Sequence, residues 1–212
     1  MSTCATGFRT RVKICGLTRP EDVQCAVDSG ADALGFVFYP PSPRAIEAEQ
    51  LAELVKSVPA FVTVTALFVN PSQEEVQSVL DAARIDLLQF HGDEDDGFCR
   101  QFHKSYIKAV RVRQASDMVE ACLRFPGALS LLLDSYKPGV PGGTGESFNW
   151  SLIPEDLNKS IILAGGLDPS NVKTAIQQVR PFAVDVSGGV EASRGIKDAS
   201  KIKAFMNEVY RD

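Results

Sequence analysis

The stretch RVKICGLTRPEDVQCAVDSGADALGFVFY, residues 11–39, holds the pattern from which the fold can be predicted. Its two ends, RVKICGL and DALGFVFY, are short and mostly apolar segments that predict strands. Between them lies a predicted helix, with Thr18 as its N-cap, Pro20 in its first turn and Gly30 beyond its end. A strand, a helix and a strand in this order are typical of a parallel βαβ unit.

The rest of the chain repeats this alternation. Further strands are expected over residues 61–69, 85–90, 106–112, 128–134, 160–166 and 182–189. Further helices are expected over residues 46–58, 71–83, 94–103, 116–125, 168–179 and 198–211, with a short helical stretch near Trp150. Ser72 and Glu75 have the spacing of a capping box.

The order and composition of these segments predict a closed parallel barrel. Strands that are nearly continuous apolar runs suit a parallel sheet covered on both faces. Eight strand–helix units in succession predict a single (β/α)8 TIM barrel domain over residues 1–212, with residues 1–10 as an irregular extension. An open doubly wound sheet is the alternative, although no G-x-G-x-x-G motif follows the first strand.

The composition limits the partners that the chain can bind. With 22 Lys and Arg against 27 Asp and Glu, the net charge is -5 and no basic run stands out, which argues against a nucleic-acid partner. No segment approaches the roughly 18 apolar residues of a membrane span, and the first residues lack the apolar core of a signal peptide. Five cysteines without a C-x-x-C pair favour reduced thiols and a cytoplasmic location over a disulfide framework or a zinc site.

Polar residues and glycines follow the predicted strands at their carboxyl ends, where the active sites of (β/α)8 barrels lie. The candidates are Cys15, Arg44, His91, Asp134, Gly165, Gly166, Asp185, Ser187, Gly188 and Gly189. The last two strands each end in a glycine pair, and barrels often bind phosphate with these two turns and a short helix. The segment GGVEASRGIKD could supply that helix from about Gly189. We therefore expect a phosphate site, although one glycine pair alone is more typical of a tight turn.

Asp134 and Cys15 are the candidate acid and base. Asp134 ends a fully apolar strand, so burial would favour its protonated form, which can donate a proton; a helix cap or an ion pair is the structural alternative. Cys15 ends the first strand, and its thiolate could act as base or nucleophile if neighbours such as Lys13 lowered its pKa. From its position alone, Cys15 is equally well interpreted as a small buried apolar residue.

Arg44 and His91 are candidates for contacts with a substrate. Arg44 follows a proline-stiffened loop, where its guanidinium could bind a carboxylate or simply be solvated. His91 ends the fourth strand, whereas His103 lies in a predicted helix and has no expected role. The spacing of His, Asp and Glu matches no metal site, so no metal is expected.

Seven segments together resemble the phosphoribosylanthranilate isomerase family of tryptophan biosynthesis. They are VKICGLTRPEDV, ADALGFVFYPPSPR, LLQFHGDE, LLLDS, GGTGESFNW, ILAGGLDPSNV and VDVSGGVE, in the family's order between about Val12 and Phe205. The resemblance implies a (β/α)8 barrel that converts N-(5-phosphoribosyl)anthranilate to 1-(2-carboxyphenylamino)-1-deoxyribulose 5-phosphate, an Amadori rearrangement without a cofactor. It also implies a monomer or a homodimer. Phe90 departs from the family, where an aliphatic residue is commoner, and we expect this to change packing rather than chemistry.

The resemblance implies a role for each candidate residue. Cys15 would be the general base and Asp134 the general acid, while Arg44 would hold the anthranilate carboxylate. His91 and Asp185 would line the substrate. The turns that contain Gly165, Gly166, Ser187, Gly188 and Gly189 would bind the phosphate.

Residues 137–149 form a glycine-rich segment that resembles the family's mobile loop after the sixth strand. We expect it to close over the substrate and exclude water, with Phe148 and Trp150 anchoring its far end. A long turn between two elements is the structural alternative.

Three rival functions fit the sequence less well. An indole-forming lyase needs a K-x-S-P-S element, which is absent, and Lys13 is one residue away from the position that its chemistry requires. A sugar-phosphate isomerase of histidine synthesis would have aspartate in place of Cys15. A barrel that binds phosphate without catalysis would not need both Cys15 and Asp134.

Overall fold

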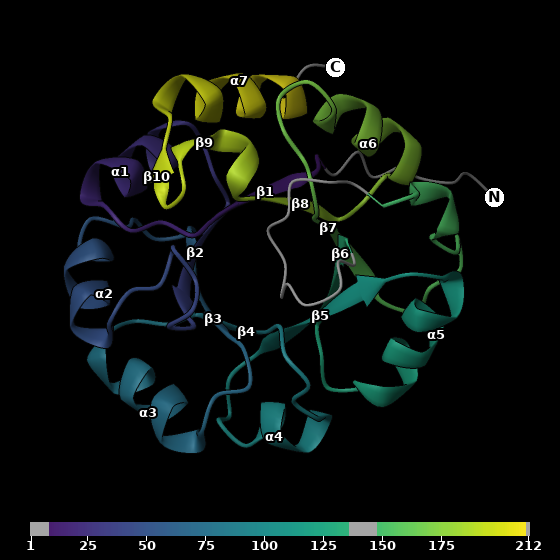
Figure 1. Cartoon of the computed structure of the whole chain (residues 1–212), viewed down its shortest axis with the longest axis horizontal. Helices are drawn as coiled ribbons and strands as arrows, with labels where there is room; N and C mark the ends of the chain where they lie inside the picture. The colour runs from purple at the N-terminus through teal and green to yellow at the C-terminus, as the bar shows by residue number, and fades with distance from the viewer. Residues whose placement is uncertain (1–8, 136–147, 211–212) are drawn as a thin grey trace.

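The computed structural model describes residues 9–135 and 148–210. Eight parallel strands close into a barrel in which each pairs with the next and β8 pairs with β1. Figure 1 looks along the barrel, with the strands forming an inner ring and the helices an outer one. The strands are β1 (Arg11–Cys15), β2 (Ala33–Phe38), β3 (Thr63–Phe68), β4 (Leu87–Phe90), β5 (Tyr106–Val112), β6 (Ser130–Ser135), β7 (Ser160–Leu163) and β8 (Ala183–Val186). The predicted (β/α)8 barrel is therefore confirmed.

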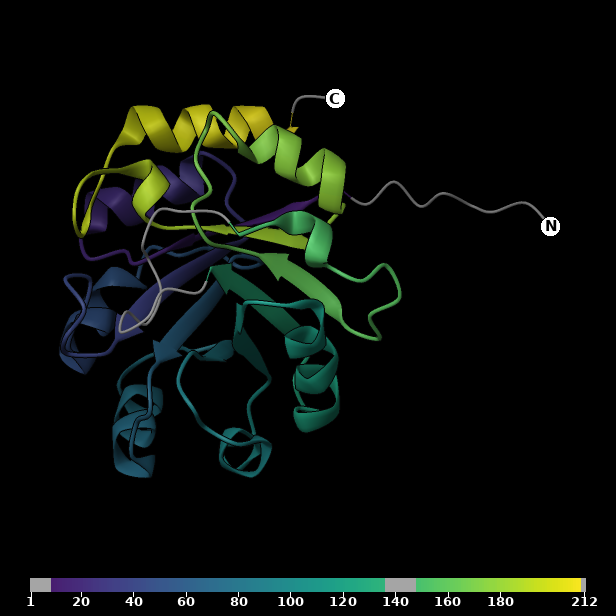
Figure 2. The ribbon, with the colours of Figure 1, turned by 45° about the vertical axis from the view of Figure 1, so that its right-hand side comes forward.

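The helices lie outside this ring, as Figure 2 shows from a second direction. They are α1 (Pro20–Asp28), α2 (Ala48–Leu54), α3 (Gln73–Ala82), α4 (Asp96–Arg100), α5 (Ala115–Arg124), α6 (Val172–Val179) and α7 (Ala199–Tyr210). Between β6 and β7 the described chain contains only a 3-10 turn, η1 (Trp150–Leu152). After β8 come a second 3-10 turn, η2 (Gly188–Val190), and a hairpin of β9 (Glu191–Ser193) and β10 (Ile196–Lys197).

Helices α2 and α4 are each several residues shorter than expected, and the chain around their ends explains why. Before α2, the Ile46 N–H donates to the Val37 carbonyl of β2, so the chain is still extended there; beyond α2, Pro59 disfavours helix at the preceding residue. Before α4, the Asp95 side chain caps the helix by accepting from the Phe98 N–H at 2.7 Å. His103 lies beyond α4 with a left-handed φ of 52°, so its predicted place in a helix is wrong.

The predicted caps have mixed outcomes. The Ser72 side chain accepts from the Glu75 N–H at 3.2 Å, and the Glu75 carboxylate accepts from the Ser72 N–H at 2.6 Å. These two bonds confirm the capping box of α3. Thr18 is not the N-cap of α1, because Arg19 occupies that position and lacks a side-chain cap. The Thr18 hydroxyl instead donates to the Gly195 carbonyl at 2.6 Å and so binds the β9–β10 hairpin.

The apolar core has two parts, on the two faces of the strands. The larger part lies between the strands and the helices. The smaller part lies inside the barrel in two clusters, one that includes Ile107 and Leu132 and one that includes Cys15 and Leu67. Because successive side chains of a strand point to opposite faces, every strand contributes to both.

Contacts also join the two ends of the described chain, Arg9 and Tyr210. The Arg9 guanidinium lies 5.0 Å from the centroid of the Tyr210 ring and donates to the Tyr210 hydroxyl at 3.2 Å. It also forms an ion pair with Asp32 at 2.6 Å.

No helix within residues 9–135 and 148–210 is long and apolar enough to cross a lipid bilayer.

Candidate active site

A cavity of about 360 Å³ opens at the carboxyl ends of the barrel strands. All ten candidate residues predicted from the sequence line it. They come from β1, β6 and β8, from the end of β4, and from the loops that follow β2, β7 and β8. The polar residues and glycines that follow the predicted strands therefore line one cavity, although the role of each residue within it is a separate question.

Cys15 lies at the end of β1 with only 4% of its surface exposed. Lys13 is two residues earlier on the same strand face, and its Nζ lies 2.8 Å from Asp185 Oδ1 on the neighbouring β8. Gly35 of β2 leaves room for this cluster, because a Cβ there would lie 2.8 Å from Cys15 Sγ and 2.9 Å from Lys13 Nζ. The thiol and the carboxylate line the cavity, and the Lys13 ammonium lies beside them, paired with the carboxylate.

The sequence left open whether neighbours such as Lys13 lower the pKa of Cys15, and in the structure the net shift is upward. Burial raises the pKa of the Cys15 thiol above its ordinary value, and this exceeds the lowering effect of Lys13. Asp185 adds to the rise through its own negative charge. Although burial opposes it, the charges of Asp185 and Cys15 raise the pKa of Lys13, so the ammonium keeps its proton.

Asp134 lies at the end of β6 and is 4% exposed. Its Oδ1 accepts from the Ser135 N–H at 2.8 Å, and its Oδ2 lies 3.3 Å from His91 Nε2. That second contact has the distance of an ion pair but not the alignment of a hydrogen bond. Since the ring order runs β1, β8, β7, β6, the acid and base candidates enter the cavity from well-separated strands.

Gln89 lines the cavity but was not among the predicted residues. Its Nε2 lies 3.4 Å from His91 Nδ1, two residues further along β4 on the same face. Its Oε1 is buried and has no hydrogen-bond partner within residues 9–135 and 148–210. The signal in the sequence was the polar Gln89 inside an otherwise apolar strand, because a buried amide oxygen needs a donor.

Arg44 reaches the cavity from the loop after β2, but a carboxylate of the protein already occupies most of its guanidinium. Its Nε and Nη2 donate to the two carboxylate oxygens of Glu191 at 2.7 and 2.8 Å. Glu191 also accepts from Lys197 Nζ at 2.9 Å. Sequence reasoning missed both partners, although Glu191 directly follows the GGV turn.

The turns after β7 and β8 both line the cavity, the first beside Asp134 and the second beside Arg44. Gly165 and Gly166 both have left-handed backbone, with φ of 80° and 67°. A Cβ at Gly165 would lie 2.7 Å from the Ser135 N and 2.8 Å from Asp134 Oδ1, so glycine is required there. After Ser187, the expected short helix is the three-residue η2, and the chain then forms the β9–β10 hairpin instead of continuing as a helix.

The predicted mobile segment, residues 137–149, lies outside the described residues up to residue 147. Phe148 and Trp150 are described, and both are partly buried against the main core. The predicted extension over residues 1–10 likewise lies outside the described residues up to residue 8.

Comparison with known proteins gives one consistent result. A model of the N-(5'phosphoribosyl)anthranilate (PRA) isomerase family matches residues 12–208. The N-(5'-phosphoribosyl)anthranilate isomerase of Pseudomonas fluorescens (strain Pf0-1) is 57% identical over 199 residues, which cover 94% of this chain and 98% of the relative. The corresponding protein of Pseudomonas putida (strain W619) is 56% identical over 199 residues, which cover 94% of this chain and 97% of the relative.

Solved structures agree with this assignment. The crystal structure of phosphoribosyl anthranilate isomerase from Thermotoga maritima has a TM-score of 0.86 and 42% identity, covering 94% of this chain and 98% of that one. A phosphoribosyl anthranilate isomerase in complex with reduced 1-(o-carboxyphenylamino)-1-deoxyribulose 5-phosphate has a TM-score of 0.83 and 41% identity, with the same coverage. This chain therefore belongs to the N-(5'-phosphoribosyl)anthranilate isomerase family.

Proposed function

We propose that this chain converts N-(5-phosphoribosyl)anthranilate to 1-(2-carboxyphenylamino)-1-deoxyribulose 5-phosphate in tryptophan biosynthesis, with Asp134 as general acid and Cys15 as general base. One observation carries the proposal: Cys15 and Asp134 come from separate strands and line the same cavity as Arg44 and the two glycine turns. A family relative has been solved with a reduced form of that reaction's product. The cavity offers the acid, base and anion contacts that such a ligand needs.

The reaction begins with opening of the sugar ring. Asp134 gives its proton to the furanose ring oxygen as the bond from that oxygen to C1 breaks. The lone pair of the anthranilate nitrogen moves into a C1=N double bond, which gives a cationic Schiff base and leaves Asp134 as a carboxylate. His91, 3.3 Å from Asp134 Oδ2, lies where a positive charge would stabilise that carboxylate.

The second step moves a proton from C2. The Cys15 thiolate removes it, the C2–H electrons form a C1=C2 double bond, and the electrons of C1=N return to nitrogen. The neutral enolamine then takes a proton at C1 as its C2 hydroxyl loses one, which gives the ketone. General acid and base steps of this kind each contribute roughly 10²–10⁴-fold to a rate.

Lys13 stabilises the thiolate that this step requires. Burial raises the pKa of Cys15, so the thiolate needs a cation beside it, and Lys13 keeps its proton because Asp185 lies 2.8 Å away. Asp185 therefore has two roles in this proposal. It lines the cavity beside the substrate and holds the ammonium against Cys15.

Two sets of groups bind the ends of the substrate. The turns with Gly165, Gly166, Ser187, Gly188 and Gly189 bind the phosphate through backbone N–H groups. Arg44 binds the anthranilate carboxylate with the edge that Glu191 leaves open, because Nη1 has no acceptor among the described residues. No cofactor takes part in this proposed reaction.

We place the protein in the cytoplasm as a monomer or a homodimer, without a nucleic-acid or membrane partner. The four described cysteines are free, as expected in a reducing compartment. One relative, from Thermotoga maritima, is described as a dimeric phosphoribosylanthranilate isomerase. Sedimentation at several protein concentrations distinguishes the two oligomeric states.

The test is loss of anthranilate-derivative fluorescence when the protein is added to N-(5-phosphoribosyl)anthranilate generated in situ. We expect rapid loss with the parent and a fall of about 10²–10⁴-fold or more with Cys15→Ala or Asp134→Ala. Cys122→Ala is the matched control, because Cys122 is a partly buried thiol on α5 outside the cavity. A folded parent without activity would overturn the function, and an active Cys15→Ala or Asp134→Ala variant would overturn the assignment of that proton.

A further inference from the structure

The β9–β10 hairpin lies between two loops of the cavity rim. It follows β8 and the short η2 turn, and it sits beside α1 in Figure 1. On one side, the Thr18 hydroxyl donates to the Gly195 carbonyl at 2.6 Å. On the other, Gly195 packs against the Pro43 carbonyl, 2.7 Å from where a Cβ would lie. The hairpin is therefore fixed to the loops after β1 and β2.

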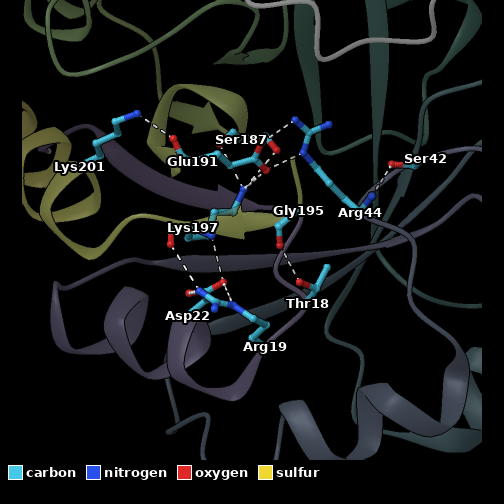
Figure 3. A network of polar contacts seen from close by, with 10 residues as sticks. All are labelled: Thr18, Arg19, Asp22, Ser42, Arg44, Ser187, Glu191, Gly195, Lys197 and Lys201. Atoms are coloured by element: carbon cyan, nitrogen blue, oxygen red, sulfur yellow. Dashed lines mark hydrogen bonds and ion pairs between the residues drawn. The ribbon is translucent and has the colours of Figure 1, made fainter. Parts of the chain in front are cut away.

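Glu191, the first residue of this hairpin, is a buried carboxylate between two cations. Figure 3 shows Arg44 and Lys197 converging on it. Arg44 donates from Nε and Nη2, so the two planar groups meet in a two-point contact that fixes both distance and orientation. The Glu191 and Lys197 side chains are 5% and 0% exposed, so solvent screens this cluster weakly.

Lys197 connects the pair to the turn after β8. Its Nζ donates to the Ser187 carbonyl at 3.2 Å and lies 3.4 Å from the Ser187 hydroxyl. Its own backbone N–H is held by Asp22 of α1 at 3.1 Å, and Asp22 is bound in turn by Arg19. Figure 3 shows the continuous set of contacts from Arg19 to Arg44.

We propose that Glu191 is a positioning residue: it holds the Arg44 side chain so that the Nη1 edge of the guanidinium faces the cavity. Lys197, which contacts both Glu191 and Ser187, fixes the distance between Arg44 and the Ser187 turn. The inference rests on the proposed function, because Arg44 and the Ser187 turn are there assigned to the carboxylate and the phosphate of the substrate. Without Glu191, a long guanidinium side chain would have many rotamers and would bind a carboxylate only after losing them. Glu191 therefore contributes to recognition of the carboxylate without touching the substrate.

The test compares two ligands that differ only in the carboxylate. Reduced 1-(o-carboxyphenylamino)-1-deoxyribulose 5-phosphate is the first, and its phenylamino analogue without the carboxyl group is the second. We expect Glu191→Gln to weaken binding of the first by about tenfold or more and of the second by less than about twofold. In turnover, KM should rise about tenfold while kcat changes by less than about threefold.

A double-mutant cycle with Arg44→Lys identifies the route of the effect. If Glu191 acts through Arg44, Glu191→Gln should add little to the loss already caused by Arg44→Lys. Full additivity, or equal weakening of both ligands by Glu191→Gln, would overturn the positioning role. Glu53→Gln is the matched control, since it makes the same change in an exposed pair with Lys56.

Two further results separate this inference from its premise. A parent that neither binds the product analogue nor turns over substrate would overturn the proposed function itself. A fully active parent whose Glu191→Gln variant binds both ligands normally would overturn the positioning role alone. If circular dichroism shows that Glu191→Gln is unfolded, the same comparison is made with Glu191→Asp, which keeps the charge but withdraws it by one methylene.

Discussion

The two faces of β4 show how one strand serves two different purposes. Phe90 points outward and is fully buried among Phe68, Phe98, Phe102 and Tyr106, with ring centroids 5.9–6.2 Å away. The residues on either side of Phe90 point inward, where they line the cavity as an amide and an imidazole. Neighbouring residues of this strand therefore contribute either to the packing between strands and helices or to the polar lining of the cavity.

The comparison teaches that stability and activity have separate sources in this barrel. Outward side chains gain free energy by leaving water, which is largely independent of the groups on the inner face. Inward polar groups such as Lys13, Asp134 and Asp185 are buried at a cost, which ion pairs and hydrogen bonds partly offset. Substitutions on the two faces should therefore affect different measurements.

The largest expected effect is on the inner face. Asp134→Asn should lower kcat/KM by about 10²–10⁴-fold, because the amide cannot give a proton to the ring oxygen. The free energy of unfolding should change far less, since the amide is nearly the same size. Steady-state kinetics and urea denaturation of the same preparation measure both quantities. If the fall in activity matched the fall in the fraction of folded protein, stability and activity would not be separable at Asp134.

Phe90→Ala, on the outer face, should have the opposite pattern. Removing a fully buried ring that contacts four others should lower the free energy of unfolding by about 3–5 kcal/mol. Below the unfolding transition, kcat should stay within about threefold of the parent. Phe90→Leu keeps a large apolar side chain at this position and should recover most of the stability. A large fall in kcat for folded Phe90→Leu would show that the two faces are coupled.

Lys13 and Asp185 should shift the pH dependence of activity in opposite directions. In the proposed mechanism the base is the Cys15 thiolate, so activity should rise with pH through the pKa of Cys15, which burial raises and Lys13 lowers. Lys13→Met should therefore move the ascending limb to higher pH, by about one unit or more. Asp185→Asn removes a negative charge that raises the pKa of Cys15, so the limb should move to lower pH.

Iodoacetamide labelling of the Cys15 peptide, followed by mass spectrometry across pH, measures the same pKa without substrate. Cys122 provides the internal control, because its pKa is raised by burial and lowered by Lys159, not by Lys13 or Asp185. Shifts of both variants in the same direction would contradict the assigned charges.

The smallest effect is expected at Phe61, which is neither in the core nor in the cavity. Its side chain is fully exposed and its backbone is left-handed, with φ of 69°. Phe61→Asn should raise the free energy of unfolding by up to about 1 kcal/mol, because asparagine adopts this conformation more readily. Denaturation at two protein concentrations checks this. A stability loss that grows with concentration would instead place Phe61 in a contact between two copies.

Features that depend on one strand could be predicted from the sequence. The apolar runs fixed the number and order of strands, and the polar residues at their ends, such as Cys15 and Asp134, identified the residues of the cavity. This worked because parallel strands in a barrel bring all their carboxyl ends to one side.

Features that depend on two distant segments could not be predicted. Glu191 binds Arg44 147 positions away, and no local pattern indicates such a partner. Thr18 has the local sequence of a helix cap. Its actual partner, the Gly195 carbonyl, is distant in the sequence and reaches the Thr18 hydroxyl only in the folded protein. The direction of the Cys15 pKa shift could not be predicted for the same reason, since it depends on burial and on Asp185.

The contact between Arg9 and Tyr210 has a consequence for the connectivity of the chain. Since these residues touch, a short linker that joins Tyr210 directly to Arg9 would span little distance, and new termini could be placed elsewhere in the chain. The exposed loop around Phe61, between α2 and β3, is a suitable new origin, because exposed loop tips tolerate new termini. A circular permutant that starts there should form the same eight-stranded ring, with the order of synthesis changed and the architecture retained.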